Sequence, residues 1–306
     1  MKIYILDALH PSGVEYAAKH AEVVRWDDPS VKDWREDADA VLVRMTRVTA
    51  DDIARIRKAK VICKQGVGYD TIDIAAAKKH GIPVCRTPGV NSEAVAEMAM
   101  ALALSVARRT TEADRLIRAG VPVQRPDILG VEMSGKTVGI IGLGNIGRLS
   151  ARKWRAAFDC GILFYDPYVE SDAYEKCETL GAMLPRVDLL TVHCPLNDET
   201  RGMVGAKELA LMKPTAIVVS TARGGIVDEA ALYEALTNQR LFGAGLDVWD
   251  EIEPPRKDHP LLQLPNVVAT PHTAGNTHET QARSSLQTAM LAVEVLQGKP
   301  ARNRVA

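Results

Sequence analysis

The sequence predicts an α/β protein with two domains, each built on a doubly wound parallel sheet. Short apolar runs alternate with amphipathic helical stretches through most of the 306 residues, and this alternation is typical of parallel sheets covered by helices on both faces. A motif of the form G-x-G-x-x-G occupies residues 142–147, far from the start of the chain. Because 306 residues are enough for two domains, we expect one domain to precede this motif and the other to be organised by it.

The first part of the chain alternates strand and helix candidates up to residue 91. The strand candidates are Lys2–Leu6, Glu22–Trp26, Ala40–Met45, Val61–Lys64 and Pro83–Arg86. The helical stretches between them are Pro11–Lys19, Asp51–Lys58 and Ile72–His80. Each return from helix to strand has a plausible stop, such as the Gly81 and Pro83 that follow the third helical stretch.

A long helix is expected from Glu93 to about Ala119, with Asn91 or Ser92 as its N-cap. Residues 94–104 are apolar on nearly all sides, and a helix of this kind is buried between layers or between subunits. We interpret it as the crossing into the second domain, and it is also suited to a homodimer contact.

The second part repeats the alternation and ends in a helix. Its six strand candidates are Thr137–Ile141, Ile162–Tyr165, Leu189–His193, Ala216–Thr221, Gly243–Val248 and Val267–Thr270. The final stretch, Thr277 to Leu296, has apolar residues at helical spacing, and we expect it to return to the first domain. The predicted domains are therefore residues 1–91 with 276–306, and residues 92–275.

Composition and charge argue against several classes of partner. The net charge is −1, with acids and bases interspersed, which is unlike a nucleic-acid or anionic membrane surface. The five cysteines are scattered without a C-x-x-C pair, so we expect reduced thiols in a cytoplasmic protein and no metal site. No apolar stretch has membrane-spanning length, and the N-terminus lacks the apolar core of a secretory peptide.

The glycine motif predicts a dinucleotide site. It lies between the strand Thr137–Ile141 and a helical stretch. In such a turn Gly142 permits the tight bend, Gly144 lets backbone approach a pyrophosphate, and Gly147 lets helix and strand pack closely. The phosphates would sit on the helix N-terminus at Asn145 and Ile146, where amides and the helix dipole favour anions.

An acid at the end of the next strand selects between NAD and NADP. Asp166 stands 19 residues after Gly147, close to the expected separation of about 20 residues. Its carboxylate would accept hydrogen bonds from ribose hydroxyls and repel a 2′-phosphate, so the cofactor is predicted to be NAD. The alternative is that Asp166 only caps the turn before Pro167.

Three further polar residues directly follow or end predicted strands. They are Arg223, Asp247 and His272. Alone, each is most simply a solvated arginine, a loop cap or a hydrogen-bonded histidine. Ligands bind outside the carboxyl ends of the strands of an open parallel sheet, so together the three predict a reaction centre on one rim, beside the nicotinamide.

The chain resembles the D-isomer-specific 2-hydroxyacid dehydrogenases, the family of phosphoglycerate, hydroxypyruvate and D-lactate dehydrogenases, over essentially its whole length. In the second domain the resemblance rests on Gly142–Gly147, His193–Leu196 with Thr200 and Gly202, Thr221–Asp228, Gly243–Val248 and Thr270–His272. In the first domain it rests on Val43-Arg44, Val48-Thr49 and Gly66–Asp70. It implies a flavodoxin-like substrate domain, a Rossmann NAD-binding domain and a homodimer.

The resemblance also implies residue roles. Arg223 would pair with the carboxylate of a small 2-keto or 2-hydroxy acid and polarise its carbonyl. His272 would be the general acid in reduction and the base in oxidation, with its pKa raised by a nearby carboxylate.

Further roles follow from the same resemblance. Asp247 would hydrogen-bond the nicotinamide carboxamide. The backbone amides near Val67 and Gly68 would bind the substrate carboxylate. The cofactor would be lined by His193, Cys194, Thr200, Thr221 and Gly275. Arg44, with Arg47, could neutralise a second anionic group or be a solvated surface residue.

One departure from the family concerns the catalytic Glu, which usually stands five residues after the strand-end Asp and directly before Pro. Here Ile252 occupies the fifth place after Asp247, and the acid before proline is Glu253. We infer a one-residue insertion and assign the role to Glu253, with Glu251 as the alternative.

Other functions within the same fold stay open. A formate dehydrogenase is expected to have extra N-terminal sequence and a Gln in place of the catalytic Glu. A phosphite-oxidising relative is not distinguished by motif. Members of the family that act as corepressors bind NAD(H) as a conformational signal, without turnover.

Overall fold

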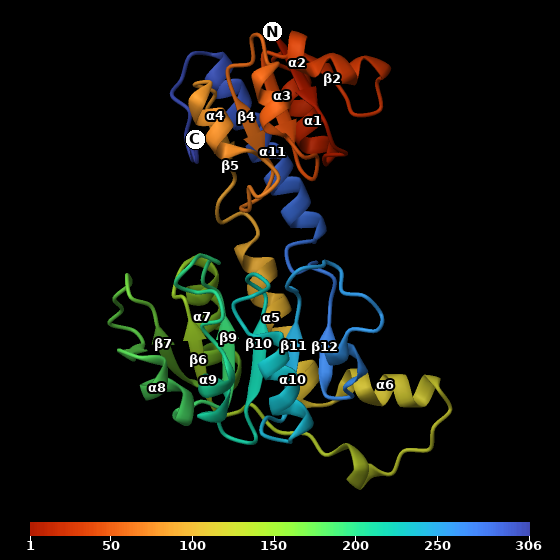
Figure 1. Cartoon of the computed structure of the whole chain (residues 1–306), viewed down its shortest axis with the longest axis vertical. Helices are drawn as coiled ribbons and strands as arrows, with labels where there is room; N and C mark the ends of the chain where they lie inside the picture. The colour runs from red at the N-terminus through yellow and green to blue at the C-terminus, as the bar shows by residue number, and fades with distance from the viewer. The chain divides into compact units, whose positions relative to one another are not determined.

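The computed structural model describes all residues from Met1 to Ala306 and divides the chain into two compact units. Unit 1 consists of Met1–Asn91 and Asn276–Ala306, and unit 2 consists of Ser92–Gly275. Both chain ends therefore belong to unit 1 (Figure 1). Each unit is built around one parallel sheet.

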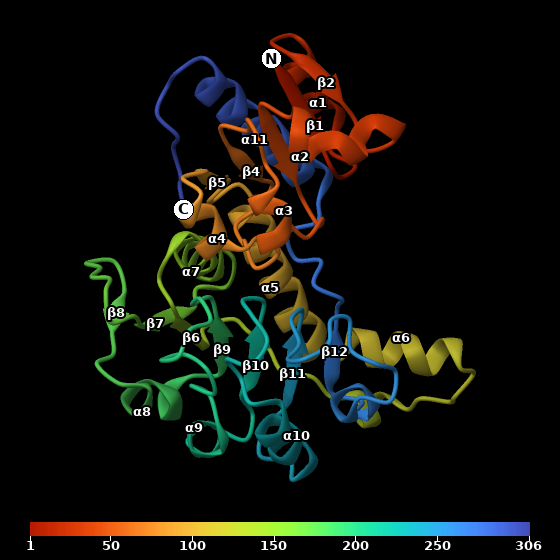
Figure 2. The same ribbon diagram turned by 45° about the horizontal axis from the view of Figure 1, so that its top comes forward.

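The sheet of unit 1 has five parallel strands in the order β2-β1-β3-β4-β5 (Figure 2). Their bounds are Lys2–Ile5 (β1), Glu22–Val24 (β2), Ala40–Val43 (β3), Ile62–Lys64 (β4) and Val84–Arg86 (β5). Side chains alternate between the two faces, so Ile3 and Ile5 enter one apolar cluster while Tyr4 enters the other. This is the flavodoxin-like strand order, with its switch point between β1 and β3.

Helices cover both faces of this sheet. One face carries α1 (Pro11–Ala18) and α11 (His278–Leu296), and the other carries α2 (Trp34–Asp37), α3 (Ala50–Ala54) and α4 (Ile74–Lys79). The helices α1 and α11 approach closely, because a Cβ on Gly13 would lie 2.2 Å from the Ser285 hydroxyl oxygen. Ser12 Oγ also donates to the Ala282 carbonyl at 2.9 Å. The last helix thus completes the core of unit 1.

The sheet of unit 2 has seven parallel strands in the order β12-β11-β10-β9-β6-β7-β8 (Figure 2). Their bounds are Thr137–Ile141 (β6), Gly161–Tyr165 (β7), Glu175–Lys176 (β8), Leu189–Val192 (β9), Ile217–Ser220 (β10), Gly243–Leu246 (β11) and Val267–Ala269 (β12). The chain reverses direction across the sheet at β6, which is where a dinucleotide-binding sheet holds its ligand. The predicted fold class, two doubly wound parallel-sheet domains, is confirmed.

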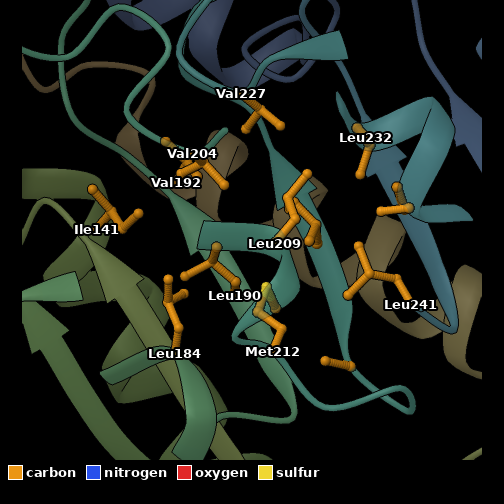
Figure 3. Packing of buried hydrophobic residues seen from close by; sticks show 14 of the residues in the cluster. Ile141, Leu184, Leu190, Val192, Val204, Leu209, Met212, Val227, Leu232 and Leu241 are labelled. Carbon is orange, nitrogen blue, oxygen red and sulfur yellow. The ribbon is translucent and has the colours of Figure 1, made fainter. Parts of the chain in front are cut away.

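Two apolar layers enclose this second sheet. On one side α5 (Ser92–Ala107) and α7 (Asn145–Phe158) pack around the fully buried Trp154. On the other side lie α8 (Leu180–Met183), α9 (Ala206–Ala210) and α10 (Glu229–Thr237). Figure 3 shows this second layer, in which Leu190 and Val192 of β9 meet Leu209 of α9.

Two predictions of elements are wrong. The helix expected from Glu93 to about Ala119 is broken into α5 and α6 (Thr110–Arg118) by Arg109, which has a left-handed φ of 50°. Six strands were expected in the second sheet, and the seventh is β8. It was not predicted because its two residues, the exposed Glu175 and the half-buried Lys176, are polar and form no apolar run.

The apolar surface of α5 is used inside unit 2. A Cβ on Gly245 of β11 would lie 2.8 Å from Leu102 Cβ of α5, so the helix and the sheet are in direct contact at this glycine. By contrast α6 has no buried residue. It projects from the sheet together with the segment after it (Figures 1 and 2), and this region exposes Ile117, Val121 and Leu129.

None of the helices combines the length and apolar character needed to cross a bilayer. No cluster of three or more His, Cys, Asp or Glu side chains has a geometry that could hold a metal ion. All five cysteines are free thiols.

Candidate active site

The turn between β6 and α7 has a shape that only glycine permits. Gly142 has a φ of +89°, and a Cβ there would lie 2.8 Å from the Cys194 amide nitrogen. A Cβ on Gly147 would lie 2.1 Å from the Gly142 carbonyl oxygen. Gly144 has nothing within 4 Å of its Cβ position. The outer two glycines therefore serve close backbone packing, and the middle one leaves open space for a ligand.

Helix α7 begins at this turn without a side-chain cap. Its N-cap is Gly144, which has no side chain to accept hydrogen bonds. The amides of Asn145 and Ile146, in the first turn of a helix of 14 residues, therefore have no side-chain cap. Such a helix N-terminus favours an anion such as a pyrophosphate.

Asp166, at the end of β7, is buried and already holds two backbone amides. Its Oδ2 accepts the Leu143 N–H at 2.8 Å, and its Oδ1 accepts the Tyr168 N–H at 2.9 Å. The bond to Tyr168 is the turn-capping alternative expected from the sequence. Since each carboxylate oxygen can accept a further hydrogen bond, the bond to Leu143 places an acceptor beside the glycine turn without excluding a ribose contact.

Two buried polar atoms without partners lie after the next strands. They are His193 Nδ1, after β9, and Thr221 Oγ1, after β10. Buried polar groups are normally satisfied, so these atoms fit a polar ligand at this edge of the sheet. Burial lowers the pKa of His193 to about 4, and this imidazole is therefore neutral.

Neither Cys194 nor Thr200 is a reactive group in this site. Burial raises the pKa of the Cys194 thiol to about 11, so it is not a thiolate at neutral pH. The Thr200 hydroxyl donates to the Pro195 carbonyl at 2.7 Å and accepts the Asn197 N–H at 2.9 Å. Thr200 thus shapes the loop after β9, while Gly275 is the last residue of unit 2.

The loop after β10, which carries Arg223, packs directly on the loop after β11. A Cβ on Gly224 would lie 1.9 Å from the Trp249 carbonyl oxygen. The Arg223 guanidinium donates through Nη1 to the Ala222 carbonyl at 2.7 Å. The position of Arg223 therefore depends on the segment that also carries Glu253.

His272 and Glu253 form the central contact of the site. His272 Nδ1 and Glu253 Oε2 are 2.5 Å apart. The other oxygen of Glu253 accepts the Trp249 N–H at 2.8 Å, which orients the carboxylate. Glu251, the alternative partner, instead lines a cavity on another side of the loop. The structure thus places Glu253 against the imidazole.

The charges of this group shift its pKa values in opposite directions. The hydrogen bond that His272 donates to the Glu253 carboxylate raises the pKa of His272 above its ordinary value, although burial and the Arg223 guanidinium oppose the shift. Burial acts to raise the pKa of Glu253, but the bonds from His272 and from the Trp249 amide outweigh it, so this pKa is lowered. The three side chains are therefore electrostatically coupled, and the protonated form of His272 is stabilised relative to that of an isolated histidine.

Asp247 anchors the segment that presents His272. Its side chain is fully buried and accepts the Thr270 hydroxyl at 2.5 Å and the amides of Thr273 and Ala274 at 2.8 Å each. The His272 N–H donates to the Asp247 carbonyl at 2.8 Å. These bonds hold His272 at a φ of 57°, a left-handed conformation that costs a non-glycine residue free energy. The sequence did not indicate this anchoring role.

The predicted substrate residues Arg44, Val67 and Gly68 belong to unit 1. The Asp7 carboxylate accepts the amides of Arg44 and Thr46, at 2.5 and 3.0 Å, and so fixes the turn after β3. Gly66, with a φ of +113°, donates its N–H to Thr87 Oγ1 at 2.8 Å.

Two residues of unit 1 that support these turns were not predicted. Arg86 Nη1 donates to the Val67 carbonyl at 3.1 Å, and its guanidinium lies 5.5 Å from the centre of the Tyr69 ring. Asp7 lies two residues after β1 and directly after the predicted strand Lys2–Leu6, so the strand-end criterion used in the second domain would have found it. Arg44 is half-buried and Arg47 is exposed.

A comparison with known families decides the family. The family described as D-isomer specific 2-hydroxyacid dehydrogenase, NAD binding domain, matches residues 100–274. The chain belongs to the D-isomer specific 2-hydroxyacid dehydrogenases. The matched residues include the glycine turn, Arg223, Glu253 and His272.

Individual members of the family are similar over the whole chain. The D-3-phosphoglycerate dehydrogenase of Methanocaldococcus jannaschii is 40% identical over 100% of this chain, which spans only 59% of that protein. The glyoxylate reductase of Aeropyrum pernix is 36% identical, over 99% of this chain and 95% of that protein. The NADPH-dependent glyoxylate/hydroxypyruvate reductase of Sinorhizobium meliloti has a TM-score of 0.87 and 30% identity, covering 100% of this chain and 97% of that one.

Proposed function

We propose that this protein is a nicotinamide-dependent oxidoreductase that interconverts a 2-keto acid and a D-2-hydroxy acid. The observation that carries the proposal is the contact of 2.5 Å between His272 and Glu253, in a unit whose β6–α7 turn is shaped for a dinucleotide. Unit 2 would then bind the cofactor and unit 1 the substrate. The bound nicotinamide would supply or accept the hydride.

Arg223 and His272 would act directly on the substrate. A guanidinium presents a planar fork that suits a carboxylate, so Arg223 would hold the acid group and polarise the carbonyl. His272 is bound to Glu253 through Nδ1, which leaves Nε2 to give a proton to the carbonyl oxygen during reduction and to remove it during oxidation. The side chain of His272 is 42% exposed, so a small molecule can reach it.

Glu253 would act through His272. A carboxylate on Nδ1 fixes the tautomer and stabilises the imidazolium form. Asp247 would support the same imidazole by holding the backbone of His272, and it would also hydrogen-bond the nicotinamide carboxamide. The amides of Val67 and Gly68 would bind the substrate carboxylate, and Arg44 would face any second anionic group.

The proposed cofactor is NAD rather than NADP. The Asp166 carboxylate lies beside the glycine turn through its bond to the Leu143 amide, where it would repel a 2′-phosphate. Because one reductase of the same fold is NADPH-dependent, the preference for NAD is tested by measuring turnover with NADH and with NADPH. The other proposed cofactor contacts are Gly142, Gly144, Asn145, Ile146 and Gly147 with His193, Cys194, Thr200, Thr221 and Gly275.

We also propose a cytoplasmic homodimer. The free thiols fit a reducing compartment. Because the apolar surface of α5 is packed within unit 2, the dimer contact would lie instead on α6 and the segment after it, where Ile117 and Leu129 are 72% and 69% exposed. Sedimentation equilibrium of the wild type and of an Ile117→Asp, Leu129→Asp variant would measure it. A wild type that sediments as a monomer would refute this part of the proposal.

The activity is tested with a panel of 2-keto acids, comprising glyoxylate, hydroxypyruvate, pyruvate, phosphohydroxypyruvate and branched-chain analogues, each with NADH and with NADPH. We expect turnover of at least one acid with NADH, and its loss in Arg223→Ala and in His272→Ala. The matched control is Arg240→Ala, an exposed residue of the same unit. Turnover of formate or phosphite, without turnover of any 2-keto acid, would identify the protein as a formate or phosphite dehydrogenase instead. An NADH-dependent partner without turnover of any acid would favour a corepressor-like sensor.

A further inference from the structure

The carboxylate of Glu229, the first residue of α10, closes the loop that carries Glu253. Its Oε1 accepts the Asp250 N–H at 2.6 Å, and its Oε2 lies 3.0 Å from His259 Nε2. Asp250 and His259 are the two ends of the segment from which Glu253 projects. One carboxylate, only 18% exposed, therefore joins both ends of this loop.

The ends are also fastened to the strand edge through Trp249. The His259 ring meets the Trp249 ring edge-on, with the centroids 5.3 Å apart. Trp249 donates its indole N–H to the Thr270 carbonyl at 3.0 Å and its backbone N–H to Glu253 at 2.8 Å. Glu229, His259 and Trp249 thus form a continuous path to the carboxylate that contacts His272.

The middle of the loop has little packing to replace these anchors. Glu251, Ile252, Pro255, Arg256 and Asp258 line a cavity of about 710 Å³ that Glu229 also borders. Glu251 and Ile252 are exposed. A segment that lies over a cavity gains few apolar contacts, so its conformation depends on hydrogen bonds. Apart from the bonds at its ends, Gln263 Nε2 donates to the Lys257 carbonyl at 2.8 Å.

The hydrogen bonding of the His259 ring also indicates that Glu229 holds this end of the loop. Its Nδ1 is buried without a partner, which is consistent with a proton on Nε2 that is donated to Glu229. No second acceptor for that proton is present in the structure. The Glu229 carboxylate is therefore the hydrogen-bonding partner of the His259 ring, beside the ring contact with Trp249.

We propose that Glu229 is a positioning residue, which sets the contact between Glu253 and His272 by binding Asp250 and His259 at the two ends of the loop. Glu229 does not touch the reacting atoms in this role. The inference deepens the proposed function and rests on it for its kinetic consequence, but the positioning itself can be measured without turnover.

The experiment is an NMR titration of the His272 ring in the full-length chain, for the wild type and for Glu229→Ala, Glu229→Asp and Glu229→Gln. The charged groups that act on this imidazole are Glu253 and Asp247, which raise its pKa, and Arg223, which lowers it. If the loop moves Glu253 away, we expect the titration midpoint to fall. The control is Glu234→Ala, an exposed residue of the same helix, which should leave the midpoint unchanged.

The three variants separate geometry from charge. Glu229→Asp keeps the charge but shortens the side chain, so it should behave like Glu229→Ala if reach matters. Glu229→Gln keeps an acceptor for the Asp250 amide and should be intermediate. If Glu229→Asp keeps the wild-type midpoint while Glu229→Gln does not, Glu229 acts through its charge alone and the proposal is overturned.

Two further measurements complete the test. His259→Phe keeps a ring against Trp249 but removes the donor to Glu229, so it should lower the titration midpoint of His272. This variant tests the same link if the Glu229 variants do not fold. Where turnover is found, kcat for keto acid reduction should fall by up to roughly 100-fold in Glu229→Ala, with KM for the cofactor unchanged. A folded Glu229→Ala with a wild-type midpoint would overturn the inference, whether or not the protein turns over any acid.

Discussion

Replacing Asp247 by Asn tests whether the buried carboxylate holds His272 in place. The carboxylate is fully buried and accepts three hydrogen bonds, from the Thr270 hydroxyl and from the amides of Thr273 and Ala274. An amide has one oxygen, so its NH₂ group would face one of these donors. An unsatisfied buried donor costs about 1–3 kcal/mol, and bonds to a charged acceptor contribute about 1.5–3 kcal/mol each. We therefore expect a loss of about 2–4 kcal/mol in the free energy of unfolding.

Thermal melting and the acid-base behaviour of His272 are the assays. For a unit of this size each kcal/mol corresponds to about 2–4 °C, so the melting temperature of Asp247→Asn should fall by about 5–15 °C. The left-handed backbone at His272 costs about 1–2 kcal/mol and should relax once its anchor is weakened, which would also reduce turnover. Asp172→Asn, an exposed acid of unit 2, is the control. A melting temperature and His272 titration both equal to those of the control would refute the anchoring role.

Three further predictions concern other parts of the molecule. In Glu253→Gln the pKa of His272, which Glu253 raises, should fall. Because reduction needs the protonated imidazole, the alkaline limb of the plot of kcat/KM for reduction against pH should move to lower pH. An alkaline limb at the wild-type pH would contradict the role of Glu253. Asp166→Ser should increase the ratio of kcat/KM for NADPH to that for NADH by roughly 10-fold or more, because a like charge near the 2′-phosphate is removed; no change in the ratio would remove the basis for NAD preference. Gly13→Ala would place a Cβ 2.2 Å from Ser285 Oγ and 2.4 Å from the Ser285 carbonyl oxygen, so unit 1 should lose about 1–3 kcal/mol of stability. The measurement is denaturation of this variant beside Gly181→Ala, whose Cβ would meet only Thr179 Oγ1, at an ordinary contact distance of 3.8 Å. Equal losses in the two variants would show that the close approach of α1 and α11 is unimportant.

The architecture was accessible from the sequence where burial leaves an apolar run. β9 and β10 are buried along their whole length, so they stand out as apolar segments. The break at Arg109 was not accessible, because left-handed backbone is expected of Gly or Asn. Here it accompanies bonds of 2.7 Å from the Arg109 guanidinium to Glu112 and to the Asp127 carbonyl, and the second of these is a contact between distant residues.

The candidate site was accessible in part for the same reason. Strand ends are visible in the sequence, and this criterion selected Arg223, Asp247 and His272. The choice between Glu251 and Glu253 depends on the path of an irregular loop, which spacing alone does not determine. The links from Glu229 to Asp250 and His259 join residues 21 and 30 positions apart, so no local pattern contains them.

The position of α11 has a consequence for the order in which the molecule is assembled on the ribosome. Unit 2 is continuous in sequence, so it can complete its core once residue 275 has been released. The face of the first sheet formed by Ile3, Ile5 and Leu42 is covered by α11, residues His278–Leu296. At a synthesis rate of about 5–20 residues per second, this apolar face lacks α11 and is covered only by α1 for roughly 10–40 s. The nascent chain therefore exposes part of an apolar sheet face during this interval, and transiently exposed apolar surface of this kind promotes aggregation.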